Sequence, residues 1–317
     1  MNDGRTLLRG VTAPVVTPMA APGRPDHLAA PDLLPRLAAA GVRGLLLLGS
    51  NGEGSLLPAS SIGAYATAAA RAWRSLVADG PVLVNVSAQG TLDARAKAEA
   101  ALAAEPDAFL LSPPGYFRHR DDEIVAHFAA LAEYGVPVVA YNAPRYANPL
   151  TPTLVARVLR LGHVIGIKDS SGDAELFASI VAIAREVGGV GVTQGAESRL
   201  AAGLRAGADG IAPGLANFAP GPMAGLVTAY ETGNDAALDH LQTVADGLAA
   251  LHAIRPGVPS VKELLRQRGL CTEHVAPPLL PCDAAERAAI QVFAADQAEH
   301  LIEAGSGRVP PGHGPEY

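Results

Sequence analysis

Short apolar runs alternate with longer amphipathic segments along most of the chain. Eight of these runs are apolar on both faces and rich in Val, Ile and Leu, as strands covered by helices are. They lie at 12–16, 44–48, 82–86, 108–111, 137–141, 164–167, 190–193 and 209–212. Strands that alternate with helices in this way form βαβ units. The pattern therefore predicts a parallel sheet.

The segments between these runs have helical periodicity. They lie near 31–40, 58–78, 91–104, 121–134, 151–161, 173–187, 197–206 and 219–232. Thr91 and Thr151 stand where helices should begin, and Pro152 takes the first helical position. Trp73 and Phe128 are expected to face the core. Eight strands about 25–30 residues apart predict an α/β fold of the (β/α)8, or TIM, barrel type, because a doubly wound sheet usually has fewer strands.

The strand pattern disappears after residue 233. Helices are expected at 235–254, 258–269 and 283–304, so residues 233–304 should form a C-terminal helical region beside a catalytic barrel of residues 1–232. The Gly- and Pro-rich segment 305–317 is expected to be a disordered tail. A length of 317 residues is compatible with this division, because α/β barrels alone exceed 200 residues.

Composition excludes several classes of protein. With 24 Lys and Arg against 31 Asp and Glu, the net charge is -7 and no basic cluster is visible, so nucleic acid and anionic lipid are not expected partners. Residues 210–230 are uncharged, but their prolines and glycines would interrupt a membrane-spanning helix. The first residues lack the apolar core of a signal peptide. A cytoplasmic protein that crosses no membrane is expected.

Sequence spacing also disfavours a metal site. None of the nine histidines directly follows a predicted strand or has i,i+4 ligand spacing around an acidic residue, and Cys271 and Cys282 lack a CxxC partner. A serine hydrolase is disfavoured because no GxSxG motif is present.

Candidate chemistry lies where predicted strands end, since the active sites of such barrels are built at the C-terminal ends of strands. Lys168 directly follows the run 164–167, and a lysine held against apolar walls has a lowered pKa and a nucleophilic amine. The alternative is a lysine that reaches solvent or pairs with Asp169. By contrast, Lys97 lies in a segment expected to be an exposed helix; with Lys262, these are the only lysines of the chain.

Tyr141 ends the preceding strand and should lie beside Lys168, where a phenol can transfer protons during carbon–carbon cleavage. Alternatively, it covers the barrel core with its hydroxyl in solvent. The loop GSNGEG, residues 49–54, offers backbone N–H groups and the Ser50 and Asn51 side chains to a small carboxylate. It has neither the Walker A nor the dinucleotide-binding spacing, and a tight turn that needs glycine is the alternative. Glu53 is expected to serve the turn or the following helix start.

An amine at the barrel rim indicates imine chemistry on a carbonyl substrate. This chemistry requires no organic cofactor or metal, because the imine itself accepts the electron pair.

Six segments in order resemble the dihydrodipicolinate synthase/N-acetylneuraminate lyase family of Schiff-base pyruvate aldolases. They are GVTAPVVTP (10–18), GLLLLGSNGE (44–53), SPPGYF (112–117), VVAYNAP (138–144), GIKDSSGD (166–173) and GADGIAPGLANFAP (207–220). The similarity extends over about residues 10–300 and implies a lyase with a TIM barrel.

The resemblance also implies roles for individual residues. Lys168 would form an imine with the keto carbon of pyruvate or another 2-oxo acid, and Tyr141 would relay protons. Tyr116 would complete the relay across a dimer contact in a homo-oligomer, a dimer or tetramer. The substrate would be bound by Gly49, Ser50, Asn51, Ser170 and Arg145.

The branch of the family depends on two departures. Dihydrodipicolinate synthases usually have a Thr-Thr pair where this chain has Ser50 and Asn51, and an arginine where it has Tyr146; Arg145 lies one residue earlier. The loop 49–54 and GVPSVKELL (257–265) are more similar to 4-hydroxy-2-oxoglutarate aldolases. Cleavage or formation of a 4-hydroxy-2-oxo acid is therefore expected. The alternatives are a dihydrodipicolinate synthase, a sugar-acid aldolase or dehydratase, and a non-catalytic 2-oxo-acid-binding protein.

Overall fold

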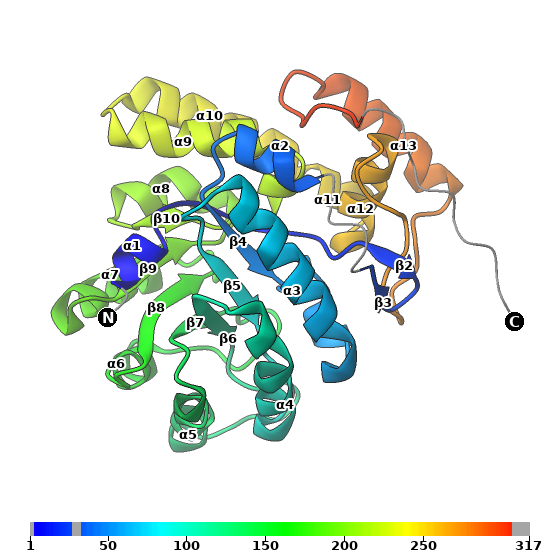
Figure 1. Ribbon diagram of the computed structural model, residues 1–317. Coiled ribbons are helices and arrows are strands. Elements are labelled where there is room, and N and C mark those ends of the chain that lie inside the picture. The colour runs from blue at the N-terminus through cyan, green and yellow to red at the C-terminus, as the bar shows by residue number, and fades with distance from the viewer. Residues whose placement is uncertain (1–2, 27–32, 306–317) are drawn as a thin grey trace, which may run out of the picture.

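The computed structural model describes residues 3–26 and 33–305. Eight parallel strands close into a barrel in the order β1-β10-β9-β8-β7-β6-β5-β4, which confirms the predicted (β/α)8 architecture (Figure 1). Their ends differ from the predicted ones by up to two residues. They are β1 (Gly10–Pro14), β4 (Gly44–Leu47), β5 (Val82–Asn85), β6 (Ala108–Leu111), β7 (Val138–Asn142), β8 (Val164–Asp169), β9 (Gly191–Gln194) and β10 (Gly210–Ile211).

A helix follows each barrel strand and covers the outside of the barrel. These helices are α2 (Leu33–Ala39), α3 (Ala59–Leu76), α4 (Thr91–Ala101), α5 (Asp121–Ala129), α6 (Pro152–Leu159), α7 (Ala174–Val187), α8 (Leu200–Arg205) and α9 (Pro220–Glu231). The first two residues of the predicted helix 31–40 lie outside the described residues. Thr151 caps α6 as predicted, because its hydroxyl accepts a hydrogen bond from Leu154 N–H. Thr91 instead pairs with the His127 ring at 2.9 Å.

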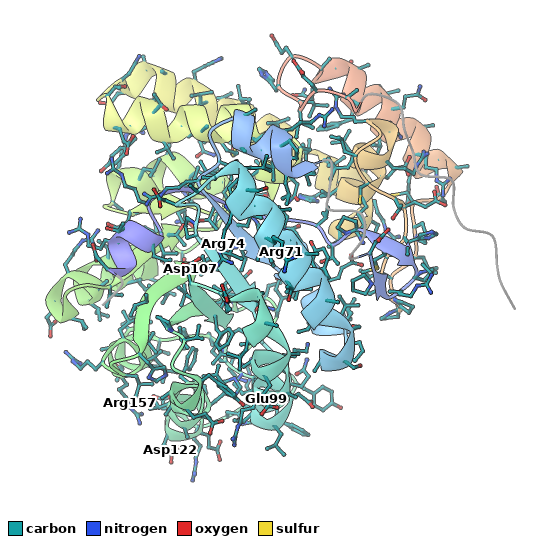
Figure 2. All side chains as sticks on the ribbon, in the orientation of Figure 1. Arg71, Arg74, Glu99, Asp107, Asp122 and Arg157 are labelled. Atoms are coloured by element: carbon teal, nitrogen blue, oxygen red, sulfur yellow. The ribbon has the colours of Figure 1, made fainter. Side chains whose placement is uncertain are left out.

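Apolar side chains form an outer and an inner core. Trp73 and Phe128 are fully buried between barrel and helices, as predicted. The inner cluster fills the barrel and consists of Leu7, Leu8, Leu46, Leu83, Ala108, Leu110, Val139, Tyr141 and Ala143. Many charged side chains lie at the surface, and the Arg74–Asp107 pair, 3.3 Å apart, joins the end of α3 to the start of β6 (Figure 2).

Two short elements were not predicted. Helix α1 (Gly4–Leu7) lies against the N-terminal ends of β8 and β9, where a Cβ on Gly4 would lie 1.6 Å from the Ile165 carbonyl oxygen. Helix α1 contributes Leu7 to the inner cluster and so closes the barrel at the end where the strands begin. The second is the antiparallel pair of β2 (Met19–Ala21) and β3 (Arg24–Pro25).

The C-terminal region is helical, with corrections to two predicted helices. The segment expected at 235–254 is divided into α10 (Asp235–Ala249) and α11 (Leu251–Ile254), and the one expected at 283–304 ends early as α13 (Ala284–Asp296). Helix α12 (Val258–Gln267) lies between them in sequence, and α10 packs along α9 (Figure 1). Residues 306–317 of the expected tail lie outside the described residues. No helix in the described ranges has the length and apolar character needed to cross a membrane.

Candidate active site

Lys168 and Tyr141 lie side by side at the C-terminal rim of the barrel, as predicted. They are paired in the register of β7 with β8, and the Lys168 Nζ lies 5.0 Å from the centroid of the Tyr141 ring. The Tyr141 ring packs on the inner cluster, while its hydroxyl lies 3.5 Å from Ser50 Oγ. The tyrosine therefore covers the barrel core and also points a proton-carrying group at its neighbours.

The Lys168 amine is held in a weakly solvating environment. The side chain is buried, and this burial lowers the pKa of Lys168 to about 8, with the nearby Glu197 charge opposing the shift. The Asp169 carboxylate accepts hydrogen bonds from Asn142 Nδ2 at 2.6 Å and from Ser171 Oγ at 2.8 Å. An ion pair between Lys168 and Asp169 is thus not formed, and the amine is available as a nucleophile at mildly alkaline pH.

The loop 49–54 has a backbone that glycine alone permits at two positions. A Cβ on Gly52 would lie 2.8 Å from Leu48 Cα, and one on Gly54 would lie 1.9 Å from the Leu48 carbonyl oxygen. Leu48 and Glu53 adopt left-handed φ values of 58° and 57°, which are strained for residues with a side chain. The turn expected from the sequence is therefore present, and it places Ser50 and Asn51 at the rim beside Tyr141.

Two nearby residues, Glu197 and His252, were not identified from the sequence. Glu197 Oε1 accepts a hydrogen bond from Leu215 N–H at 3.1 Å, and its Oε2 lies 3.9 Å from His252 Nε2. Burial raises the pKa of Glu197, whereas His252 and Lys168 lower it. A Cβ on Gly214 would contact both Asn51 Nδ2, at 2.8 Å, and Glu197 Oε1, at 3.0 Å. Glu197 lies three residues after the end of β9, and this position at the rim is the sequence feature that could have identified it.

The side chains of Ser170 and Lys168 both lie close to Gly195. A Cβ at this glycine would lie 2.3 Å from Ser170 Oγ and 2.7 Å from Lys168 Cε. The structure thus brings Lys168, Tyr141, Ser50 and Ser170 to one rim, with Gly49 and Asn51 in the adjoining loop.

We expect Gly195→Ala to lower the rate of imine formation about 10- to 100-fold, because the added methyl group displaces the amine-bearing arm. Reductive trapping with a 2-oxo acid, compared with the unmodified protein at equal concentration, measures this effect. Gly221→Ala is the matched control, since a Cβ there meets nothing within 4 Å. An unchanged trapping rate in Gly195→Ala would contradict the packing described.

Two predicted site residues lie at the surface. Tyr116 is 89% exposed with a left-handed φ of 48°, and its ring packs edge-on against Phe117. Arg145 is exposed, with its guanidinium 6.0 Å from the Tyr146 ring centroid. Asn148 Nδ2 donates to the carbonyl oxygens of Pro114 and Phe117, so the two surface loops are held together. Neither Tyr116 nor Arg145 contacts Lys168 within this single chain.

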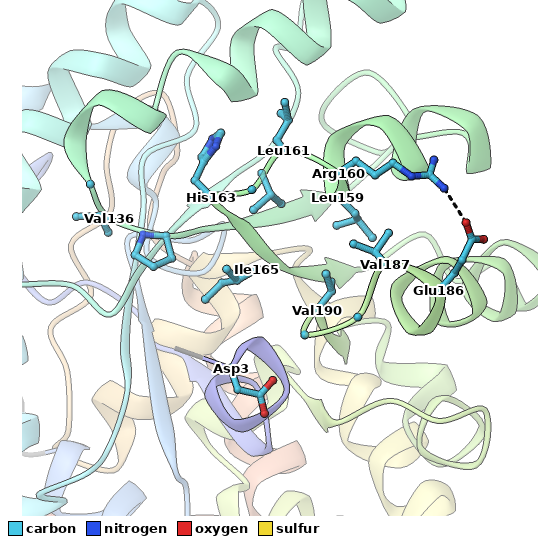
Figure 3. A pocket seen from close by; sticks show the side chains of 16 residues that line it. Asp3, Val136, Leu159, Arg160, Leu161, His163, Ile165, Glu186, Val187 and Val190 are labelled. Carbon is cyan, nitrogen blue, oxygen red and sulfur yellow. Dashed lines mark hydrogen bonds and ion pairs between the residues drawn. The ribbon is translucent and has the colours of Figure 1, made fainter. Parts of the chain in front are cut away.

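A cavity of about 880 Å³ lies at the other end of the barrel, where β7, β8 and β9 begin (Figure 3). Its polar side chains are already engaged. Arg160 pairs with Glu186 at 2.7 Å, and His163 Nε2 lies 3.0 Å from the Phe128 carbonyl oxygen. This cavity and Lys168 therefore lie at opposite ends of the barrel. Within residues 3–26 and 33–305, no group of three His, Cys, Asp or Glu side chains is placed to hold a metal ion.

One expectation about a buried charge was wrong, and another was incomplete. Lys97 was expected to be exposed, but it is buried, and its Nζ donates a 2.6 Å hydrogen bond to the Gly54 carbonyl oxygen. Glu53 was expected to serve the turn or the following helix start, and its side chain also forms a buried ion pair with Lys262, 2.5 Å long. In both cases the partner is distant in sequence, so local pattern gave no indication of it.

Comparison with known proteins gives consistent results. The model of the Dihydrodipicolinate synthetase family matches residues 7–297. A DapA-like lyase of Halobacterium salinarum is 31% identical over 91% of this chain and 94% of its own length. A 4-hydroxy-tetrahydrodipicolinate synthase of Acidithiobacillus ferrooxidans is 31% identical over 69% of this chain and 74% of its own length. The crystal structure of the E. coli K12 prophage protein YagE in complex with pyruvate superposes with a TM-score of 0.84, at 27% identity, over 92% of this chain and 99% of that one.

Proposed function

Because the chain belongs to the dihydrodipicolinate synthetase family, a family of pyruvate-dependent lyases, we propose that it makes or breaks a carbon–carbon bond between a 2-oxo acid and an aldehyde. Pyruvate is the proposed 2-oxo acid, and a 4-hydroxy-2-oxo acid the proposed aldol. The observation that carries this proposal is the pairing of a desolvated Lys168 amine with the Tyr141 phenol on adjacent strands.

The proposed mechanism begins with attack of the neutral Lys168 amine on the C2 carbonyl of the aldol. Tyr141 delivers a proton to the resulting alkoxide and becomes a phenolate. A second proton then moves from the nitrogen to the new hydroxyl group, and water leaves as the protonated imine forms. Tyr141 then accepts the proton of the C4 hydroxyl while the C3–C4 bond breaks. The electron pair of that bond enters the imine to give an enamine, and the aldehyde departs. Tyr141 returns this proton to C3 of the enamine, and water then hydrolyses the imine, which releases pyruvate and regenerates the Lys168 amine and the Tyr141 phenol.

Substrate binding is assigned to the rim around this pair. The N–H groups of loop 49–54, with Ser50 and Asn51, would hold the substrate carboxylate, because such loops present donors to anions. Ser50 also lies within 3.5 Å of the Tyr141 hydroxyl, which would place the carboxylate next to the proton relay. Ser170 would bind near the imine from the opposite side.

The exposed Tyr116 supports a further part of the proposal, a homo-oligomer. A bulky, 89% exposed tyrosine in a strained conformation is suited to insertion into a second copy of this chain. In such a dimer, its hydroxyl would join the relay of the neighbouring subunit.

Reductive trapping tests the proposed imine. The protein is incubated with pyruvate, reduced with borohydride and digested, and the modified residue is located by mass spectrometry. A stable adduct on Lys168 is expected. If none forms in folded protein, longer 2-oxo acids are tried, and failure with all of them would overturn the proposal.

The trapping rate should depend on pH in a defined way. Only the neutral amine attacks, so below the Lys168 pKa of about 8 the rate should fall about tenfold per pH unit, and above it the rate should level off. The measurement stops timed incubations from pH 6 to pH 10 with excess borohydride. A rate that still rises steeply at pH 10 would show that Lys168 keeps the pKa of an ordinary lysine.

An aldehyde panel separates the alternatives within the family. Glyoxylate with pyruvate would yield 4-hydroxy-2-oxoglutarate, the product proposed from the loop sequence. Aspartate semialdehyde tests the synthase, for which Arg145 is the available cation. Glyceraldehyde tests a sugar-acid aldolase, favoured by the Glu197 carboxylate near Asn51, since hydroxyl groups can donate to it. Binding of 2-oxo acids without turnover of any aldol would instead indicate a non-catalytic binding protein.

A further inference from the structure

Two buried lysines hold the loop 49–54 from outside the loop. Lys262, on α12, is fully buried; its Nζ lies 2.5 Å from Glu53 Oε2 and donates to the His274 carbonyl oxygen at 2.7 Å. Glu53 Oε1 accepts a hydrogen bond from Ala276 N–H, also at 2.7 Å. One residue of the loop is therefore tied at both carboxylate oxygens to the C-terminal helical region.

The second lysine, Lys97, binds the residue that follows Glu53 in the loop. Lys97, on α4, donates a 2.6 Å hydrogen bond to the Gly54 carbonyl oxygen. Thr17 Oγ1 similarly donates to the Gly52 carbonyl oxygen at 2.7 Å. Side chains from separate parts of the barrel thus fix successive points of the loop backbone.

The loop needs such support because its conformation is not one that its residues prefer. Leu48 and Glu53 both have left-handed φ values, and residues with side chains keep such values only when the surroundings impose them. Glu53 is also the residue that Lys262 holds. Removal of one member of a buried ion pair leaves the other charge uncompensated, so the backbone around Glu53 should relax when Lys262 is lost.

We propose that Lys262 is a positioning residue, which acts through Glu53 to fix the loop that binds the 2-oxo-acid carboxylate. This inference rests on the proposed function and deepens it. The C-terminal helical region then helps to set the substrate affinity of a site built on the barrel, and Lys97 supports the same loop from α4. Neither lysine takes part in the bond-making steps.

The test compares Lys262→Met with the unmodified full-length protein in pyruvate trapping. We expect the pyruvate concentration for half-maximal trapping to rise about 10- to 100-fold, because displacement of binding groups by about 1 Å has effects of that size. The limiting trapping rate at saturating pyruvate should change less than about threefold, since Lys168 and Tyr141 stay in place. Lys97→Met removes one hydrogen bond to the loop and should change the same quantity in the same direction, less strongly.

Glu263→Gln is the matched control. Glu263 follows Lys262 on α12, is buried, and accepts hydrogen bonds from Arg266 and Gln267 in the C-terminal region. Its replacement should lower the melting temperature without raising half-saturating pyruvate. A rise equal to that of Lys262→Met would overturn the inference, because general loosening would then explain both.

The remaining outcomes are also decisive. If Lys262→Met does not fold, Lys97→Met decides the question, and unchanged half-saturation in the folded variants overturns the inference. If the unmodified protein traps no 2-oxo acid, the proposed function itself fails, and the inference fails with it. Trapping by the unmodified protein together with unchanged variants would refute the positioning role alone.

Discussion

Replacement of Lys168 with alanine is expected to lower turnover of the best aldol substrate about 10⁴-fold or more. The imine carries the electron pair released by bond cleavage, and none of the neighbouring side chains at the rim has an amine to replace it. The variant should bind no 2-oxo acid covalently. Turnover and borohydride trapping, measured on the same preparation, check both statements.

Lys168→Arg is the matched control for charge. The guanidinium keeps the positive charge but stays protonated at any working pH, so this variant should be as inactive as the alanine variant. Lys168→Ala removes an amine whose charge is disfavoured by burial, whereas Lys168→Arg keeps a permanent charge in the same buried position, so the arginine variant should melt at a lower temperature than the alanine variant. Residual turnover within tenfold of the unmodified protein would exclude the imine mechanism.

Tyr141→Phe is expected to have the second-largest effect, a loss of about 10²- to 10⁴-fold in turnover, the range typical of a lost general acid–base group. The phenylalanine ring should keep the packing on the inner cluster, so the fold and the half-saturating pyruvate concentration should change little. The limiting rates of trapping and of turnover are the quantities to compare.

A structural effect of this substitution would look different. It would lower the melting temperature and the amount of active protein, while leaving the rate per active site unchanged. Undiminished turnover in Tyr141→Phe would mean that another group, such as Ser50, transfers the protons.

The barrel could be predicted because its strands are buried on both faces and separated by amphipathic helices. Elements that depend on tertiary contacts could not be predicted from the sequence. Helix α1 has four residues, too few for a periodic signal. Helix α13 ends before the predicted position, and beyond it Ile302 N–H donates to the Phe218 carbonyl oxygen at 2.7 Å. That contact, made after the helix ends, brings the segment back to the barrel.

The same distinction applies to the site. Lys168, Tyr141 and Ser50 lie at or just after the C-terminal ends of strands, and the active sites of such barrels are built there, so the sequence is enough to predict that they lie together. Glu197, Lys97 and Lys262 act through partners distant in sequence, and their roles depend on how α4, α12 and the rim meet in space. Burial of a lysine needs a specific acceptor, and the sequence does not indicate which acceptor that is.

The burial of all three lysines has a practical consequence. Lys97 and Lys168 are each 6% exposed and Lys262 is 0% exposed, so the folded chain presents almost no lysine side chain to solvent. Ubiquitin ligases, acetyltransferases, lysine-specific proteases and activated-ester dyes all need an accessible lysine. The lysines of the folded protein should therefore resist these enzymes and reagents, and reaction at a lysine should report unfolding or local opening.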